Sequence, residues 1–289
     1  MQDTFTYYFR KYTFTLLLLA CFSTINLAQQ VDKKFYNLYT PDELPNNSVL
    51  DIIQDQKGFM WFGTPNGLCR YDANRLKLFQ HDVNDTSSIS DNNISKILTD
   101  KKGNLWIGTR NGLNLFNAKE GNFKRFFYGD TKKRNIVIKS IFEDADSILW
   151  VGTSNGLFKM KSRNDFTFQK TQDQPLPSDQ YSEKYFSSIC QDVAGNIWTS
   201  GNKMIYKFSK NGKILAQFDC SAYFRNTASS EMINTLAIDK DQRLWIGGSD
   251  GSLLFINCTQ DVFENLLLKK PHPDYVQNGI YQIYKDALN

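Results

Sequence analysis

All five tryptophans of this 289-residue chain occupy the same place in a repeated sequence. They stand 44 to 48 residues apart, at Trp61, Trp106, Trp150, Trp198 and Trp245. An aspartate lies six residues before each Trp, and apolar residues lie nine and twelve residues before it. A period in the mid-forties, built from short apolar runs and turn residues, indicates stacked supersecondary units. This repeat constrains the fold more than any other feature of the sequence.

The second repeat illustrates the strands that we expect in each unit. Its predicted strands are residues 94–98, 104–108, 113–116 and 123–128. Asp100 begins a tight turn before the second strand, because its side chain can accept backbone hydrogen bonds. Asn111-Gly112 predicts the next hairpin, since both residues tolerate the left-handed conformation that such turns require. Four-stranded antiparallel units that repeat radially are the blades of a β-propeller, so the prediction is an all-β propeller of about five blades.

Other positions of the repeat have structural explanations. Each Trp is expected to pack between blades. A glycine two residues later permits close approach of the next sheet, at Gly63, Gly108, Gly152 and Gly247. The threonines that follow at Thr64, Thr109 and Thr153 are expected to bond to a loop. The fourth repeat lacks Asn-Gly and predicts a shorter turn, while residues 170–185 and 217–232 predict extended loops between blades.

Both ends of the chain predict an open ring. Residues 34–39 are similar to the last strand of a unit, and in a ring such a strand would complete the final blade. Ile280, Ile283 and Asp286 repeat the spacing that opens each unit, so a sixth blade begins near Ile280. Its Trp would fall at position 292, beyond Asn289. We therefore expect five blades, the first strand of a sixth, an incomplete ring, and a fragment of a longer protein.

The N-terminal residues 1–28 are typical of an export signal. Arg10 and Lys11 precede a short apolar core at residues 12–22, and Ala28 is the expected last residue removed. Lipidation of Cys21 is the alternative. Residues 29–289 are then the mature propeller region, expected in the periplasm.

Charge and cysteine content exclude little. The formal net charge is +4, and the only basic cluster is Lys132, Lys133 and Arg134, which we interpret as a solvated loop. No contact with nucleic acid is therefore expected. The four cysteines after the signal are expected to be buried apolar side chains, and a disulfide remains open without a choice of pair; they are Cys69, Cys190, Cys220 and Cys258.

The sequence offers few candidates for chemistry, and we predict no catalytic residue, no cofactor and no metal site. His81 and His272 are the only histidines, each in a predicted loop. Carboxylates could offer oxygen ligands to calcium without the usual loop pattern, at Asp82, Asp85 and Asp91 or at Asp239 and Asp241. Loop tyrosines could stack on sugar rings or fill blade edges; they are Tyr181, Tyr185 and Tyr223.

Residues 100–113 read Asp-x-x-Gly-x-Leu-Trp-Ile-Gly-Thr-x-Asn-Gly-Leu and, with the preceding Ile-x-x-Ile, resemble the two-component regulator propeller repeat. Residues 55–68 and 144–157 match nearly as well, and the resemblance spans about residues 35–289. It implies the periplasmic sensor region of a hybrid two-component system of Bacteroidetes. The longer protein would hold two seven-bladed propellers, an immunoglobulin-like domain, a membrane helix in the inner membrane, and histidine kinase, receiver and DNA-binding parts.

The resemblance also implies a function, namely non-catalytic sensing of an oligosaccharide, with a possible homodimer. The repeat motif does not itself bind ligand in that family, so the ligand-binding residues stay unknown. Two alternatives are a propeller glycosidase or lyase, and a protein-interaction scaffold. A glycosidase needs two carboxylates about 5 to 10 Å apart at one pocket, and the sequence singles out no such pair.

Overall fold

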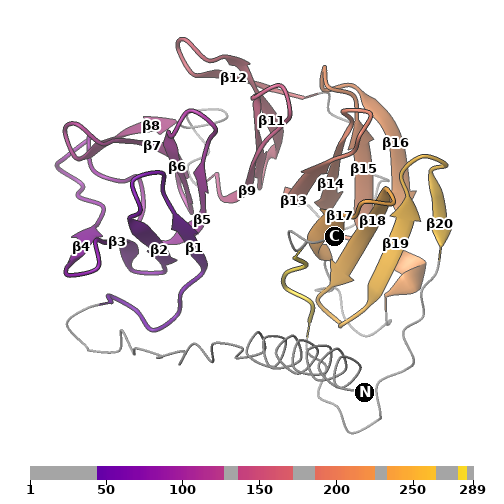
Figure 1. Ribbon diagram of the computed structural model, residues 1–289, viewed down its shortest axis with the longest axis horizontal. Helices are drawn as coiled ribbons and strands as arrows, with labels where there is room; N and C mark the ends of the chain where they lie inside the picture. The colour runs from indigo at the N-terminus through magenta and orange to yellow at the C-terminus, as the bar shows by residue number, and fades with distance from the viewer. Residues whose placement is uncertain (1–43, 127–135, 172–185, 225–232, 265–278, 285–289) are drawn as a thin grey trace, which may run out of the picture. The chain divides into compact units, whose positions relative to one another are not determined.

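A computed structural model describes residues 44–126, 136–171, 186–224, 233–264 and 279–284 (Figure 1). All of these residues lie in the unit Tyr39–Asn289. They form five four-stranded antiparallel sheets, and in each sheet neighbouring strands are consecutive in the chain. We call the sheets blades 1 to 5 in chain order. Among the described residues, no helix is both long and apolar enough to span a membrane.

The strands are short, with three to seven residues each. Blade 1 holds β1 (Asp51–Gln54), β2 (Met60–Thr64), β3 (Gly67–Tyr71) and β4 (Leu76–Phe79). Blade 2 holds β5 (Ile94–Thr99), β6 (Leu105–Thr109), β7 (Gly112–Asn117) and β8 (Asn122–Phe126). Blade 3 holds β9 (Ile138–Glu143), β10 (Leu149–Thr153), β11 (Gly156–Ser162) and β12 (Thr167–Lys170).

The last two described blades keep the same order. Blade 4 holds β13 (Phe186–Gln191), β14 (Ile197–Gly201), β15 (Met204–Phe208) and β16 (Ile214–Asp219). A 3-10 turn, η1 (Ser221–Tyr223), follows it. Blade 5 holds β17 (Ile233–Ile238), β18 (Arg243–Gly248), β19 (Leu253–Asn257) and β20 (Val262–Glu264). The predicted all-β fold with four-stranded blades is confirmed.

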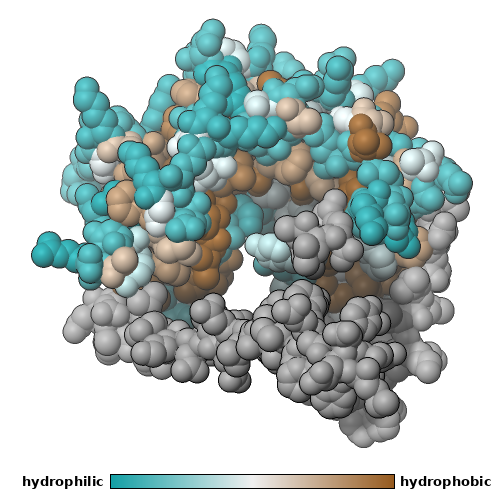
Figure 2. Space-filling model, in the orientation of Figure 1, coloured by the Kyte–Doolittle hydropathy of each residue, from teal (hydrophilic) through white to brown (hydrophobic). Residues whose placement is uncertain are grey.

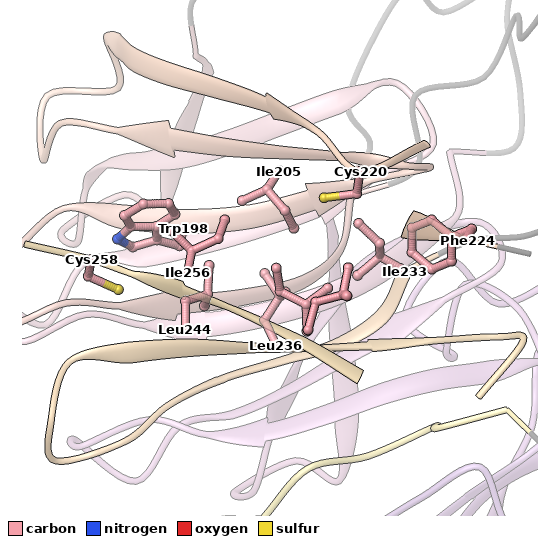
Figure 3. Close-up of a cluster of buried hydrophobic side chains, with 11 residues drawn as sticks. Trp198, Ile205, Cys220, Phe224, Ile233, Leu236, Leu244, Ile256 and Cys258 are labelled. Atoms are coloured by element: carbon pink, nitrogen blue, oxygen red, sulfur yellow. The ribbon is translucent and has the colours of Figure 1, made fainter. Parts of the chain in front are cut away.

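Four tryptophans join one blade to the next, as predicted. Trp61 of blade 1 packs in one core cluster with Ile94 and Ile97 of blade 2. The same arrangement recurs at each later interface, where Trp106, Trp150 and Trp198 share a cluster with the first two strands of the following blade. Figure 3 shows the Trp198 cluster, with Ile233, Leu236 and Leu244 of blade 5 around it. Each of these four rings is at most 1% exposed, so the core consists of the seams between sheets.

In every repeat except the fourth, a glycine two residues after the Trp permits this packing. A Cβ atom on Gly63 would lie 2.8 Å from Ile94 Cγ2, and one on Gly108 would lie 2.6 Å from Ile138 Cγ2. Real Cβ atoms do not approach other heavy atoms this closely. The close contact of the next blade's first strand therefore requires glycine at these positions, as predicted.

The hairpins between the second and third strands differ from the prediction in one respect. In blade 2, Thr109 pairs with Gly112 across a two-residue connection, and Gly112 has a positive φ of 102°. Asn111 is absent from the non-glycine residues with positive φ, so only the glycine is left-handed. The Thr109 hydroxyl also stabilises the turn, because it donates to Gly112 O at 2.9 Å and accepts from Asn111 N at 3.1 Å. The predicted bond from threonine to the loop is thus confirmed.

Two predicted boundaries in blade 4 are wrong. The hairpin was expected to be shorter, yet Gly201 pairs with Met204, which leaves the same two-residue connection, with Asn202 at φ 54°. Residues 217–219 were expected in an extended loop but belong to β16. Phe218 stacks on Trp198 with ring centroids 5.7 Å apart, and this contact holds the strand. Residues 225–232 lie outside the described part.

The expected start of a sixth blade is marked by contacts and not by a strand. Ile280 N donates to Gly248 O at 2.9 Å, and Asn234 Nδ2 donates to Ile280 O at 3.2 Å. Ser95, Ser140 and Ser187 make the corresponding bond to the first strand of the blade that follows each of them. Ile280 thus takes the place of a first-strand residue. Residues 34–39, predicted as a last strand, and residues 1–28 lie outside the described part.

Candidate functional site

The repeated aspartate holds its turn and its tryptophan together. In blade 2, Asp100 Oδ1 accepts from the backbone N of Lys102 at 3.0 Å and of Asn104 at 2.9 Å. Its Oδ2 accepts from Trp106 Nε1 at 3.1 Å. The same indole bond, at 2.8 to 2.9 Å, links Asp55, Asp144, Asp192 and Asp239 to the Trp six residues later. The sequence predicted the backbone bonds of the turn but missed the indole bond, although the constant six-residue spacing could have indicated it.

These bonds change the acidity of the carboxyl group. Burial raises the pKa of Asp100, but hydrogen bonds from Asn104, Trp106 and Lys102 outweigh it, so the pKa lies below the ordinary aspartate value. Asp239 follows the same rule, because bonds from Arg243 and Trp245 outweigh its burial and lower its pKa. Both carboxylates are ionised and occupied at neutral pH. They are structural groups, and their oxygens are not free for a ligand.

Polar side chains of one blade also satisfy the Asp turn of the blade before it. Glu143 of blade 3 accepts from Lys101 N at 2.7 Å, and Arg163 of blade 3 bridges Glu143 at 2.6 Å and Asp100 at 3.4 Å. Gln191 of blade 4 accepts from Ala145 N at 2.7 Å in the same way. This end of the blades, which we call the Asp-turn end, is therefore occupied by contacts between neighbours.

The opposite end of each sheet carries the connections between blades, and we call it the loop end. There the hairpin between the second and third strands bonds to the segment that enters the same blade. Arg110 N donates to Asn93 O at 3.1 Å, and Ser154 N donates to Val137 O at 2.9 Å. Because the strands alternate in direction, all hairpins between second and third strands lie at this end. The loop end therefore gathers the most variable segments of the chain.

The connection from blade 1 to blade 2, residues 80–93, is described throughout. Arg125 of β8 anchors it, with Nε donating to Ser88 O at 2.6 Å and Nη2 to Asp85 O at 2.8 Å. His81 Nδ1 lies 2.9 Å from Ile89 O. This histidine is thus engaged in holding the loop, which does not suit a catalytic base. His272 lies outside the described residues.

A buried polar network fixes the same loop to blade 2. Ser90 N donates to Asn114 Oδ1 at 2.9 Å, and Ser90 Oγ lies 2.8 Å from Thr109 Oγ1. All three side chains are buried. Since every one of these polar atoms finds a partner inside the blade, the network stabilises the loop and offers no group to a ligand.

The carboxylates that could have bound calcium serve turns. Asp82 Oδ1 accepts from Asn84 N at 2.8 Å, and Asp85 Oδ1 accepts from Ser87 N at 2.8 Å. Asp91 accepts from Asn93 N at 2.7 Å, while Asp239 and Asp241 pair with Arg243. In the part of the chain that the structure describes, no group of three or more His, Cys, Asp or Glu side chains could hold a metal ion.

Of the candidate tyrosines, only Tyr223 is described. It lies in η1 and packs, half-buried, against the Trp198 cluster, so it fills the blade interface. Tyr181 and Tyr185 lie outside the described residues, as does the cluster Lys132, Lys133 and Arg134.

The four cysteines that the structure describes are free thiols, and three of them are buried. Burial raises the pKa of Cys69 to about 11 and is the main cause that raises the pKa values of Cys220 and Cys258 to about 12. Cys190 is half-buried in the seam between blades 4 and 5. The predicted burial is confirmed for Cys69, Cys220 and Cys258. Cys190, Cys220 and Cys258 share one seam.

Comparisons with known proteins agree with the repeat. Residues 43–66, 88–111, 133–155 and 227–250 match the model of the two component regulator propeller family. A protein named histidine kinase P4 from Formosa agariphila is 36% identical over 75 residues, which cover 26% of this chain and 6% of that protein.

Solved structures share the fold. The extracellular domain of the putative hybrid two component system BT3049 from B. thetaiotaomicron is 20% identical with a TM-score of 0.53, covering 88% of this chain and 39% of that one. Virginiamycin B lyase from Staphylococcus aureus is 16% identical with a TM-score of 0.57, covering 79% of this chain and 73% of that one. At such identities the likeness establishes the propeller fold alone.

Proposed function

This chain is built from two component regulator propeller repeats, and from this we propose that it is the ligand-sensing region of a hybrid two-component signalling protein. The observation that carries the proposal is the match of four separate segments to that family. The relative named as a histidine kinase and the similar extracellular domain of a putative hybrid two component system support it. The chain spans only 6% and 39% of these two proteins, so the kinase and DNA-binding parts belong to the proposed longer protein.

We place the ligand at the loop end of the blades. The repeated aspartates and tryptophans are engaged with each other near the Asp-turn end, and the repeated threonines are engaged inside the hairpins of the loop end. The connections between blades vary in length and sequence, and in repeat scaffolds such segments carry recognition. The ligand class, an oligosaccharide, follows from the resemblance of the repeats to sensors of that kind. Binding would shift a dimer or interdomain equilibrium, which a membrane segment of the longer protein transmits.

The proposed location is the periplasm. Residues 1–28 would direct export and then be removed, and the longer protein would be anchored in the inner membrane. The similar structure of an extracellular domain supports this location.

Thermal unfolding of the purified chain in the presence of oligosaccharides of different composition tests the proposal. We expect one class of oligosaccharide to raise the unfolding temperature, because a ligand that binds only the folded state stabilises it. Hydrogen exchange with that oligosaccharide should show protection in loop-end segments such as residues 80–93. The Asp turns, such as residues 100–103, are the internal control and should exchange at an unchanged rate.

Two other outcomes would contradict sensing. Conversion of an oligosaccharide to products, detected by mass spectrometry, would favour the glycosidase or lyase alternative. Virginiamycin B lyase has a fold similar to that of this chain. Absence of any oligosaccharide-dependent stabilisation, together with stable capture of a partner protein, would favour the interaction scaffold.

A further inference from the structure

Two cysteines from neighbouring blades lie beside the same tryptophan ring. Cys190 of β13 is paired directly with Trp198 of β14, and residues opposite each other in an antiparallel pair project from the same face of the sheet. Cys190 therefore faces blade 5 together with the Trp198 ring, and it packs against that cluster. Cys258 of blade 5 is buried in the same cluster, and Figure 3 shows it next to the Trp198 indole.

Hydrogen bonds hold Cys258 at this position. Its backbone N donates to Gln242 O at 2.9 Å, and the side chain of Gln242 accepts from Val193 N of blade 4 at 2.9 Å. Lys207 of blade 4 pairs with Trp198 across the β14–β15 ladder, and its Nζ lies 3.4 Å from Cys258 O. Blades 4 and 5 are thus joined around Cys258 by two contacts, one through Gln242 and one through Lys207. The first contact involves Val193, which is three residues after Cys190.

The electrostatics agree with this proximity. Burial is the main cause that raises the pKa of Cys190, and the Cys258 thiol and the Asp192 carboxylate add to it. Asp192 also raises the pKa of Cys258, whereas Lys207 lowers it. The Asp192 carboxylate therefore raises the pKa values of both thiols, and Cys258 raises the pKa of Cys190 across the seam.

The third cysteine of the cluster is not placed to compete. Figure 3 shows Cys220 away from Cys258, near Ile205, with the Trp198 ring on the Cys258 side. Cys69 belongs to blade 1. The structure thus selects one pair among the possibilities that the sequence left open.

We propose that Cys190 and Cys258 form a disulfide that links blades 4 and 5 when the protein folds in an oxidising compartment. The oxidant is a protein or small-molecule disulfide. One cysteine thiolate attacks it and releases one thiol, and the second thiolate then displaces the other thiol from the mixed disulfide. Two thiols lose two protons and two electrons, and the oxidant is reduced to two thiols.

Folding and peptide mapping of the chain test this inference. The full chain is unfolded with reductant, refolded in a mixture of oxidised and reduced glutathione, alkylated, and digested for mass spectrometry. We expect a peptide pair joined through Cys190 and Cys258, with Cys69 and Cys220 alkylated. The unfolding temperature of the oxidised chain should exceed that of the same chain with dithiothreitol by several degrees, because the bridge restricts the unfolded state.

Single variants provide matched controls. Cys220→Ser removes a thiol of the same cluster and should leave the bridge intact, whereas Cys190→Ser and Cys258→Ser should each abolish it. Alkylation of both Cys190 and Cys258 in the refolded wild-type chain would overturn the proposal, and so would a bridge from either of them to Cys220. The wild-type map decides the matter even if a serine variant fails to fold. None of these outcomes depends on oligosaccharide binding, so failure here leaves the proposed function standing.

Discussion

At the scale of single residues, one carboxylate organises each blade. Asp100 is 1% exposed and accepts hydrogen bonds from two backbone amides, the Asn104 amide and the Trp106 indole. A buried charge is tolerated only when such bonds replace its hydration. The turn and the tryptophan are therefore fixed relative to each other within one blade.

Replacement of this carboxylate should change both stability and its pH dependence. In Asp100→Asn, the amide has a single acceptor oxygen, so it cannot keep both the backbone bonds at Oδ1 and the indole bond at Oδ2. We therefore expect a loss of about 2 kcal/mol at pH 7 in urea unfolding. The pKa of Asp100 in the folded chain is lowered. Its contribution is thus present above about pH 4, the unfolded value, and is lost as pH falls through the lower folded value.

The variant should consequently lose less stability than the wild type between pH 5 and pH 3. Asp146→Asn, at an exposed position of the corresponding turn of blade 3, is the control and should follow the wild-type curve. Parallel pH curves for Asp100→Asn and the wild type would contradict the role assigned to Asp100.

At the scale of elements, a glycine of one blade contacts a first-position residue of the next wherever the repeat places glycine two residues after its Trp. Gly63 faces Ile94, Gly108 faces Ile138 and Gly247 faces Ile280. These contacts set the distance between the blades, and the large Trp ring fills the rest of the seam. Interiors packed at this density do not absorb an added methyl group without displacement.

A pair of substitutions tests this coupling. Gly63→Ala places a methyl group 2.8 Å from Ile94 Cγ2, and we expect a loss of about 1 to 3 kcal/mol in urea unfolding. Ile94→Ala removes Cγ2 and should relieve the clash, so its cost should be smaller in the Gly63→Ala chain than in the wild type. Additive losses in this double-mutant cycle would show that the two residues are not coupled.

At the scale of the whole molecule, equivalent residues have different surroundings because blades differ in their neighbours. Ile97 is 2% exposed and Ile141 is 6% exposed, since a preceding blade covers each of them. Ile52 holds the same place in blade 1 and is 51% exposed. The described face of blade 1 therefore presents an apolar side chain that every later blade buries.

Alanine substitutions should separate these two positions. Ile97→Ala is expected to cost about 2 to 5 kcal/mol, as for a large side chain removed from a core. Ile52→Ala should stay within about 1 kcal/mol of the wild type, because half of its surface is already in water. Equal losses in urea unfolding would show that the face of Ile52 is covered in solution.

The exposed apolar side chains of the described surface are mostly isolated from one another. In Figure 2 hydrophilic residues dominate the visible described surface, and apolar residues appear between them in patches. Other exposed apolar side chains, such as Val83 and Val193, lie singly in turns, which is common for soluble surfaces. Ile52 differs because Leu50, two residues before it, is 49% exposed as well.

The sequence by itself determined the repeat, the four-stranded blades, the Trp seams and the glycines that permit them. These features depend on contacts at fixed separations along the chain, and a period of 44 to 48 residues records such contacts directly. Even the Trp-to-Asp bond is local, and its spacing was visible. The same locality explains why the hairpin conformation of Asn111 and the extent of β16 were misjudged. Thr109 and Trp198 decide them through side-chain contacts that a turn dipeptide or a loop pattern does not contain.

Only the tertiary structure decided which side chains meet across a seam. Cys190 and Cys258 are 68 positions apart and hold different places in their repeats, yet packing brings both to the Trp198 ring. Likewise, Ile52 and Ile97 hold the same place in the repeat and differ in burial. The physical reason is that a blade's faces are buried by its neighbours, so the environment of a residue depends on which sheet packs against it, and not on the repeat in which it stands.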